Sequence, residues 1–126
     1  MQKLPIGRQN FKQIREKNYL YVDKTKHIHE MINNGDINFL SRPRRFGKSL
    51  LVSTLKELFE GNKKLFKGLY IYNKFNWENK HPVIVLDFGG GDYRTLNSLE
   101  NKLNDIINRK AREFPLYYEQ IWKAID

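Results

Sequence analysis

The residues best suited to chemistry lie in the run Arg-Pro-Arg-Arg-Phe-Gly-Lys-Ser, which extends from Arg42 to Ser49. Its last three residues match the end of the pattern Gly-x-x-x-x-Gly-Lys-Ser/Thr. In that pattern, backbone N–H groups and the lysine hold phosphates, and the hydroxyl ligates Mg²⁺. The first glycine of the pattern is missing, because Arg42 takes its place. The run predicts a phosphate-binding loop, and a basic surface turn is the alternative.

The predicted nucleotide contacts include two arginines, which can hold phosphate bidentately or pair with carboxylates elsewhere. The full set is Arg44, Arg45, Phe46, Gly47, Lys48, Ser49 and Leu50. Ser49 is the predicted Mg²⁺ ligand. Asp87 ends an apolar run and is a second candidate for the metal, but Phe88 follows it instead of another acid, which favours a structural carboxylate. No catalytic residue is predicted.

The elements that hold this loop follow from the spacing of apolar residues. Ile37–Leu40 predicts a strand before the loop, and a helix from about Ser49 to Glu60 follows it. Gly61 is placed to end that helix, since glycine tolerates the left-handed cap conformation. The predicted loop therefore leads into the N-terminal end of a helix, which is the positive end of the helix dipole and favours phosphate.

The remaining pattern alternates between predicted strands and helices. Strands are predicted at residues 19–22 and 83–88, and residues 65–77 are ambiguous, with a strand-like stretch at residues 69–72. Helices are predicted at residues 11–15, after residues 23–25 with an end at residues 34–35, and at residues 95–112, with another from about Tyr117. Asp23 or Thr25 can cap the second of these helices, and Leu96, Leu99, Leu103, Ile106 and Ile107 are the predicted inward residues of the long one. The order favours an α/β class: a three-layer P-loop fold with a parallel sheet.

The predicted organisation is the N-terminal portion of one domain. Residues 1–35 form a helical extension, and residues 36–126 carry the strand, the loop, the helix and the following strand and helices. Trp122 and Ile125 are still at helical spacing at the end of the sequence, so we expect a truncated domain.

Composition limits the classes of protein that fit. The 126 residues include 23 basic and 14 acidic ones, a net charge of +9, which favours polyanionic partners or a solvated lysine-rich surface. The absence of cysteine excludes disulfides and cysteine-based metal sites. No apolar run reaches the roughly 20 residues of a membrane helix. We therefore expect a cytoplasmic protein without a membrane partner.

Several short motifs, in order along nearly the whole chain, resemble the predicted AAA-ATPase-like domain of bacterial proteins. They are the run Ser-Arg-Pro-Arg-Arg-Phe-Gly-Lys-Ser-Leu-Leu at residues 41–51, Leu4–Gly7, Tyr21–Thr25, Phe59–Gly61, Leu65–Leu69 and Pro82–Phe88. An arginine replaces the first loop glycine in that family too. The resemblance implies ATP and Mg²⁺ as ligands and hydrolysis by the intact protein.

The resemblance also implies features outside this sequence. Family members often carry a PD-(D/E)XK nuclease-like domain, through which nucleic acid would become a partner, and an acidic Walker B motif would follow residue 126. We therefore expect this chain alone to bind nucleotide and hydrolyse it hardly at all. Two other functions stay open: a small-molecule kinase with the same loop, and a basic, non-catalytic nucleic-acid-binding module.

Overall fold

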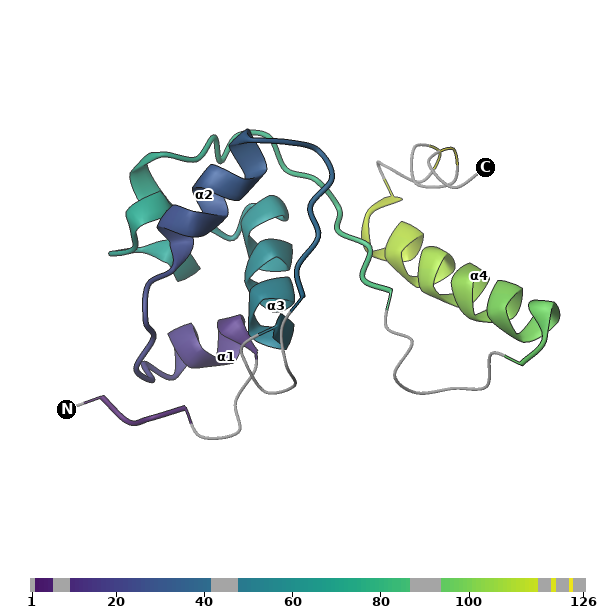
Figure 1. The fold of residues 1–126 in the computed structure, drawn as a ribbon, viewed down its shortest axis with the longest axis horizontal. Helices are drawn as coiled ribbons and strands as arrows, with labels where there is room; N and C mark the ends of the chain where they lie inside the picture. The colour runs from purple at the N-terminus through teal and green to yellow at the C-terminus, as the bar shows by residue number, and fades with distance from the viewer. Residues whose placement is uncertain are drawn as a thin grey trace. The chain divides into compact units, whose positions relative to one another are not determined.

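A computed structural model describes residues 2–5, 10–41, 48–86 and 94–115, together with residues 119 and 123. The chain divides into two units, Met1–His81 and Pro82–Asp126. The first unit contains the helices α1 (Phe11–Glu16), α2 (Thr25–Asn33) and α3 (Lys48–Phe59), followed by the short 3₁₀ helices η1 (Lys63–Phe66) and η2 (Tyr70–Asn73) (Figure 1). The second unit contains α4 (Leu96–Glu113).

Both ends of α1 are fixed by local hydrogen bonds. The side chain of Asn10 accepts the N–H of Gln13 at the start of the helix. At its end, Asn18 adopts a positive φ of 54°, and the N–H of Tyr19 reaches back to the carbonyl of Ile14 at 2.9 Å. This Schellman arrangement satisfies carbonyls that the helix leaves without partners. The short helix predicted at residues 11–15 is confirmed.

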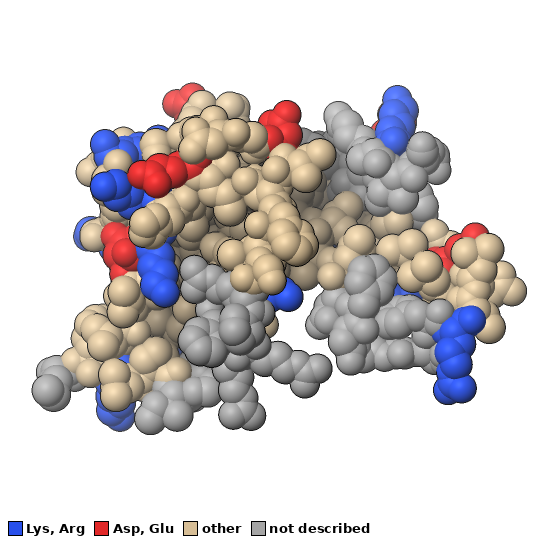
Figure 2. Space-filling model, in the orientation of Figure 1, with Lys and Arg blue, Asp and Glu red and all other residues tan. Residues whose placement is uncertain are grey.

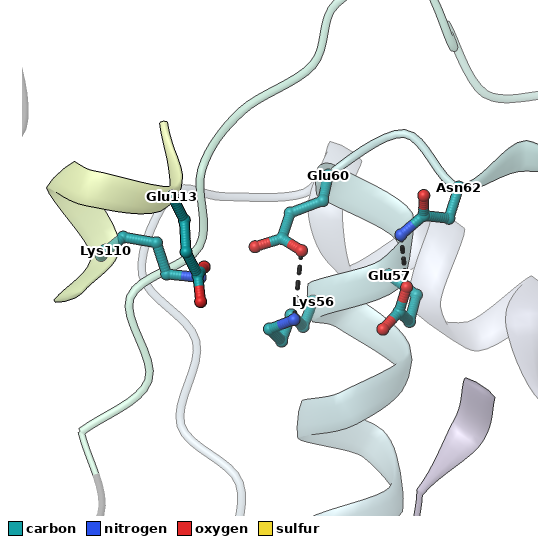
Figure 3. A network of polar contacts seen from close by, with 6 residues as sticks. All are labelled: Lys56, Glu57, Glu60, Asn62, Lys110 and Glu113. Carbon is teal, nitrogen blue, oxygen red and sulfur yellow. Dashed lines mark hydrogen bonds and ion pairs between the residues drawn. The ribbon is translucent and has the colours of Figure 1, made fainter. Parts of the chain in front are cut away.

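The end of α3 was predicted at Gly61 and is confirmed there. Gly61 has a φ of 84°, and the N–H of Asn62 returns to the carbonyl of Glu57 at 3.0 Å. Side chains repeat this link, because the amide of Asn62 donates to the Glu57 carboxylate, next to an ion pair of 3.2 Å between Lys56 and Glu60 (Figure 3). The backbone conformation that only glycine adopts readily therefore sets where α3 stops.

Aromatic side chains form much of the core of the first unit. The ring of Phe11 lies edge-on to Tyr21, with centroids 5.2 Å apart, and 4.7 Å from the ring of Phe66. Leu58 of α3 and Ile71 of η2 complete this buried centre. The core therefore joins α1 and α3 to the segment that follows them, and it anchors the helix that begins at Lys48.

The second unit is built around the inner face of α4. The hydroxyl of Thr95 accepts the N–H of Ser98 at 3.2 Å and caps the helix. Ile107 and Ala111 are buried. The long helix predicted at residues 95–112 is confirmed, but the inward position predicted for Leu96 is wrong, because its side chain is 70% exposed in the first turn.

The described residues contain no strand, so the predicted three-layer α/β fold with a parallel sheet is wrong for them. They form helices joined by irregular segments. The predicted strand at Ile37–Leu40 is irregular, and Ile37 and Phe39 are 94% and 92% exposed. β-branched and aromatic residues favour a strand only where a neighbouring strand pairs with them, and no such neighbour occurs in the described residues.

Side chains accept backbone N–H groups in the strand-like stretch at residues 69–72. The segment at residues 69–72 contains a 3₁₀ turn, and the N–H groups of Tyr70 and Ile71 donate to the side chains of Asp23 and Thr25. The segment at residues 19–22 is irregular, and its N–H of Leu20 donates to the carbonyl of Lys3 at 2.8 Å. Residues 83–86 are irregular, and residues 87–88 lie outside the described part of the chain.

Candidate functional site

Lys48 and Ser49 open α3, at the point where the sequence predicts the phosphate-binding loop to end. Both side chains are exposed, and the first turn of this 12-residue helix contains no acidic residue. The first four N–H groups of a helix have no partner within it, and they carry the positive end of the helix dipole. An ammonium group, a hydroxyl and these N–H groups on one turn are chemically complementary to an anion.

The first turn of α3 is held by the buried side of the same helix. Thr54 is buried, and its hydroxyl donates to the carbonyl of Leu50 at 2.7 Å. The hydroxyl of Ser53 accepts the N–H of Phe11, the first residue of α1, at 2.8 Å. α3 thus supplies a partner for an N–H that α1 cannot satisfy internally, and the two helices fix each other beside the candidate site.

An apolar pocket of about 490 Å³ lies in the first unit, beside the start of α3. Leu50, Leu51 and Thr54 form the α3 part of its wall, directly after Ser49 in the sequence. Small-molecule sites typically measure roughly 300–1,000 Å³ and are lined mainly by apolar side chains with a few polar groups. Both the size and the lining of this pocket are therefore those of a ligand site.

Other segments close the pocket. Ile28 and Met31 of α2 face it, and Leu20, Tyr21 and Val22 approach from the segment between α1 and α2. Leu20 and Val22 are partly exposed, so this wall reaches the surface.

Tyr21 is a polar group within this apolar wall. Burial raises the pKa of its phenol above the ordinary value of 10.0, and this effect outweighs the opposing hydrogen bond with Thr54. Tyr21 therefore remains a protonated phenol at neutral pH. Its hydroxyl is paired with that of Thr54, which in turn donates to the carbonyl of Leu50.

Asp23 and Thr25, from the motif at residues 21–25, tether α2 to η2. One carboxylate oxygen of Asp23 accepts the N–H and the hydroxyl of Thr25 at 2.9 and 2.6 Å, and the other accepts the N–H of Tyr70 at 2.7 Å. The hydroxyl of Thr25 accepts the N–H of Ile71 at 3.2 Å. Asp23 therefore binds the first N–H of α2, as predicted, although the N-cap position itself is Lys24.

The charge of Asp23 is stabilised by this arrangement. Partial burial by itself raises the pKa of its carboxyl. Hydrogen bonds from Thr25 and Tyr70 and the nearby charge of Arg15 lower this pKa by more than burial raises it, so that it lies below its ordinary 3.8. These contacts give the motif a structural role that the sequence alone does not reveal.

The structure describes part of the predicted nucleotide site. Lys48, Ser49 and Leu50 are consecutive in the first turn of α3, and Leu50 also lines the pocket. Arg44, Arg45, Phe46 and Gly47 lie outside the described residues, as does the second metal candidate, Asp87.

Sequence reasoning missed the pocket and its hydroxyl groups. Tyr21 was part of a predicted strand, and Thr54 is an unremarkable position within a predicted helix. The one signal in the sequence that could have pointed to the pocket was the motif at residues 21–25. It is part of the resemblance to the family, and the sequence alone assigns no function to it.

Among the described residues, basic side chains are not gathered into one surface on the face drawn in Figure 2. Basic and acidic side chains lie next to one another at the edge of the first unit, and uncharged side chains cover its middle. Ion pairs between residues four positions apart neutralise part of the positive charge, for example Lys56 with Glu60 at 3.2 Å and Lys12 with Glu16 at 4.0 Å. This face is that of a solvated mixed-charge surface.

The described residues contain no group of three or more His, Cys, Asp or Glu side chains that could hold a metal ion. Within the same residues, every helix is too short or too polar to cross a membrane.

Comparison with known proteins gives a family and a relative. The sequence profile of the predicted AAA-ATPase family matches residues 5–125. A protein of Azotobacter chroococcum mcd 1, described as "Uncharacterized protein in vnfD 5'region", is 50% identical over 112 residues, which cover 86% of this chain. These residues span 22% of that relative's length. No solved structure matches the chain.

Proposed function

Because this chain belongs to the predicted AAA-ATPase family, we propose that it binds ATP with Mg²⁺ at the segment that leads into α3. One observation supports this most: Lys48 and Ser49 are exposed at the start of a 12-residue helix whose first turn has no acidic side chain to repel phosphate. The full contact set in this proposal is Arg44, Arg45, Phe46, Gly47, Lys48, Ser49 and Leu50.

Each residue of this turn has a role set by its chemistry. The ammonium of Lys48 would neutralise charge on the β- and γ-phosphates, and the hydroxyl of Ser49 would ligate Mg²⁺. Gly47 would let the backbone approach the phosphates closely. Mg²⁺, when bound, would supply charge neutralisation between the phosphate groups. The exposed ammonium and hydroxyl groups on one turn fit this pair of ligands.

We propose hydrolysis of ATP as an activity of the whole protein, not of these residues alone. A bound triphosphate reacts only when a water molecule is oriented and the developing charge is stabilised. The chain spans 22% of the length of the curated relative that it matches. The nuclease-like domain that the resemblance implies, and nucleic acid as its partner, likewise stay predictions about the whole protein.

The proposal is tested by replacing Lys48 with alanine. The loss of a charge-assisted phosphate contact, roughly 1.5–3 kcal/mol, should weaken ATP binding about 10- to 100-fold. Isothermal titration calorimetry with MgATP measures this directly. Lys64→Ala is the matched control, because it removes the same charge from another exposed lysine of the first unit.

The control also separates a specific site from general attraction to a basic protein. Specific binding leaves the affinity of Lys64→Ala near that of the wild type. Equal affinity of the wild type and Lys48→Ala would refute the proposal. Equal weakening by both variants, with a steep dependence on salt, would instead favour the basic binding module.

A further inference from the structure

The segment at residues 61–77, which contains η1 and η2, combines positive charge with aromatic rings. It has four lysines, five aromatic residues and no acidic residue. All of its lysines are exposed, and they are Lys63, Lys64, Lys67 and Lys74. In the helices of the same unit, Lys12 and Lys56 each pair with an acidic side chain four positions along. The segment itself offers its lysines no such acidic partner.

Two tyrosine rings flank the buried side of η2. Ile71 is fully buried, and successive residues of a 3₁₀ helix are about 120° apart, so Tyr70 and Tyr72 lie on either side of it. Tyr70 is 40% exposed, and Tyr72 is half-buried. The ammonium of Lys74 lies 5.1 Å from the ring centroid of Tyr70. The ammonium of Lys63 lies at the same distance from the ring of Tyr72, so each ring has a cation beside it.

Contacts with neighbouring elements hold the backbone of this segment. The guanidinium of Arg15 donates to the carbonyls of Leu65 and Lys67 at 2.7 and 2.6 Å, which brings a further positive charge to η1. Asp23 brings a negative charge, because it accepts the N–H of Tyr70 at 2.7 Å. Its carboxylate is engaged by three hydrogen bonds and lies near Arg15. The surface therefore keeps an excess of positive charge on a fixed backbone.

Single-stranded nucleic acid has the two features that match this surface. Its phosphates are attracted to lysine, and its unpaired bases stack on aromatic rings. An exposed ammonium interacts only weakly with a ring, so Lys63 and Lys74 can turn to a phosphate and leave the ring to a base. A duplex keeps its bases stacked on one another, and an acidic protein has carboxylates without bases. Neither of them uses the exposed ring of Tyr70.

We infer that residues 61–77 form a binding surface for single-stranded nucleic acid, in which Tyr70 and Tyr72 stack on bases and the lysines contact phosphates. The segment follows the C-terminal end of α3, whereas the proposed ATP site lies at the N-terminal end. A 12-residue helix is about 18 Å long. The inference therefore concerns a second site and does not rest on ATP binding. It makes nucleic acid a partner of this unit itself.

Fluorescence anisotropy of a labelled oligothymidylate of about 15 nucleotides, titrated with the intact chain, tests the role of the ring. Tyr70→Leu removes the exposed ring without a change of charge and should weaken binding about tenfold. Tyr70→Phe keeps the ring and is the matched control, so it should bind as the wild type does. An oligouridylate of the same length, titrated in parallel, compares RNA with DNA.

The role of the lysines is tested by the dependence of binding on salt. Each phosphate contact on a single strand contributes about 0.7 to the slope of log affinity against log salt concentration. The double change Lys64→Gln and Lys67→Gln should therefore lower this slope by about 1.4 and weaken binding. Arg109→Gln with Arg112→Gln removes the same charge from exposed positions of α4 and should have little effect. Near-UV circular dichroism checks that each variant keeps its aromatic core.

Several results would overturn the inference. Tyr70→Leu that binds as tightly as the wild type would show that the ring takes no part. Equal weakening by the lysine pair and the arginine pair would show a general attraction to a basic protein, as would equal affinity for a duplex or for polyglutamate. Displacement of the oligonucleotide by saturating MgATP would place it at the start of α3 instead of at residues 61–77.

Discussion

Replacing Thr25 with valine removes one hydroxyl group from the tether between α2 and η2 and leaves the side chain almost the same size. The residue is fully buried. Its hydroxyl donates to Asp23 at 2.6 Å and accepts the N–H of Ile71 at 3.2 Å. Valine can do neither, so the N–H of Ile71, which belongs to a fully buried residue, loses this partner.

The expected loss of stability follows from these two contacts. A buried donor left without a partner costs about 1–3 kcal/mol. The Asp23 carboxylate is exposed, so water can replace its lost bond and this part adds little. We expect Thr25→Val to lower the free energy of unfolding by about 2 kcal/mol. Thr25→Ser keeps the hydroxyl and loses one methyl group, which should cost about 1 kcal/mol.

Urea denaturation followed by the fluorescence of Trp77 measures this loss of stability with a probe that contacts η2. The indole N–H of Trp77 donates to the carbonyl of Tyr72, within η2, at 2.8 Å. The other tryptophan is replaced in all proteins by Trp122→Phe. With a dependence on urea of about 1–3 kcal/mol per molar, a loss of 2 kcal/mol lowers the midpoint by roughly 0.7–2 M. A valine variant as stable as the wild type, or more stable than the serine variant, would refute the role of this hydroxyl.

Three further predictions concern the same unit and use the same denaturation assay. Arg15→Lys should lower the free energy of unfolding by about 1–2 kcal/mol, because the guanidinium donates to the carbonyls of Leu65 and Lys67 at 2.7 and 2.6 Å and lysine cannot keep both bonds. An unchanged urea midpoint would contradict this. Gly68→Ala should cost about 1 kcal/mol through its φ of +84° alone, since an added Cβ meets no atom within 4 Å, and a neutral result would show that the turn relaxes. The lowered pKa of Asp23 stabilises the fold above the ordinary value of 3.8, and this contribution is lost as the pH falls through the lower pKa of the folded state. Asp23→Asn should therefore flatten the dependence of stability on pH below about 4, and an unaltered acid profile would count against the assignment.

The helices were predictable because their signals are local. Apolar residues at helical spacing located α2, α3 and α4, and Gly61 marked the end of α3 through a backbone conformation that few other residues adopt. The start of α3 at Lys48 lies one residue from the predicted start. These features depend on neighbours in the sequence, so they survive without knowledge of the packing.

The sheet could not be judged from the same kind of signal. Ile37 and Phe39 have strong β propensity, but a strand is stabilised by cross-strand partners, and the sequence does not say whether they are present. In the segment at residues 69–72, the side chains of Asp23 and Thr25 compete for the backbone N–H groups. Long-range side-chain contacts of this kind have no periodic signature.

The candidate site was predictable in part for the same reason. The pattern Gly-Lys-Ser placed Lys48 and Ser49 at the start of a helix, where the structure has them. The pocket depends on segments that meet only in the folded unit, and its hydroxyl groups, from Tyr21 and Thr54, are 33 positions apart in the sequence. Tertiary packing, and not local pattern, brings them together.

The position of ATP on this chain is measured most directly by amide nitrogen–proton NMR spectra recorded while MgATP is added. Binding at the start of α3 predicts saturable shifts that are largest at the amides of Lys48, Ser49 and Leu50, since these N–H groups would face the phosphates. The same titration of Lys48→Ala should need about 10- to 100-fold more ATP. Saturating ATP that leaves these three amides unmoved, or that shifts mainly residues of α4, would contradict a nucleotide site at this helix.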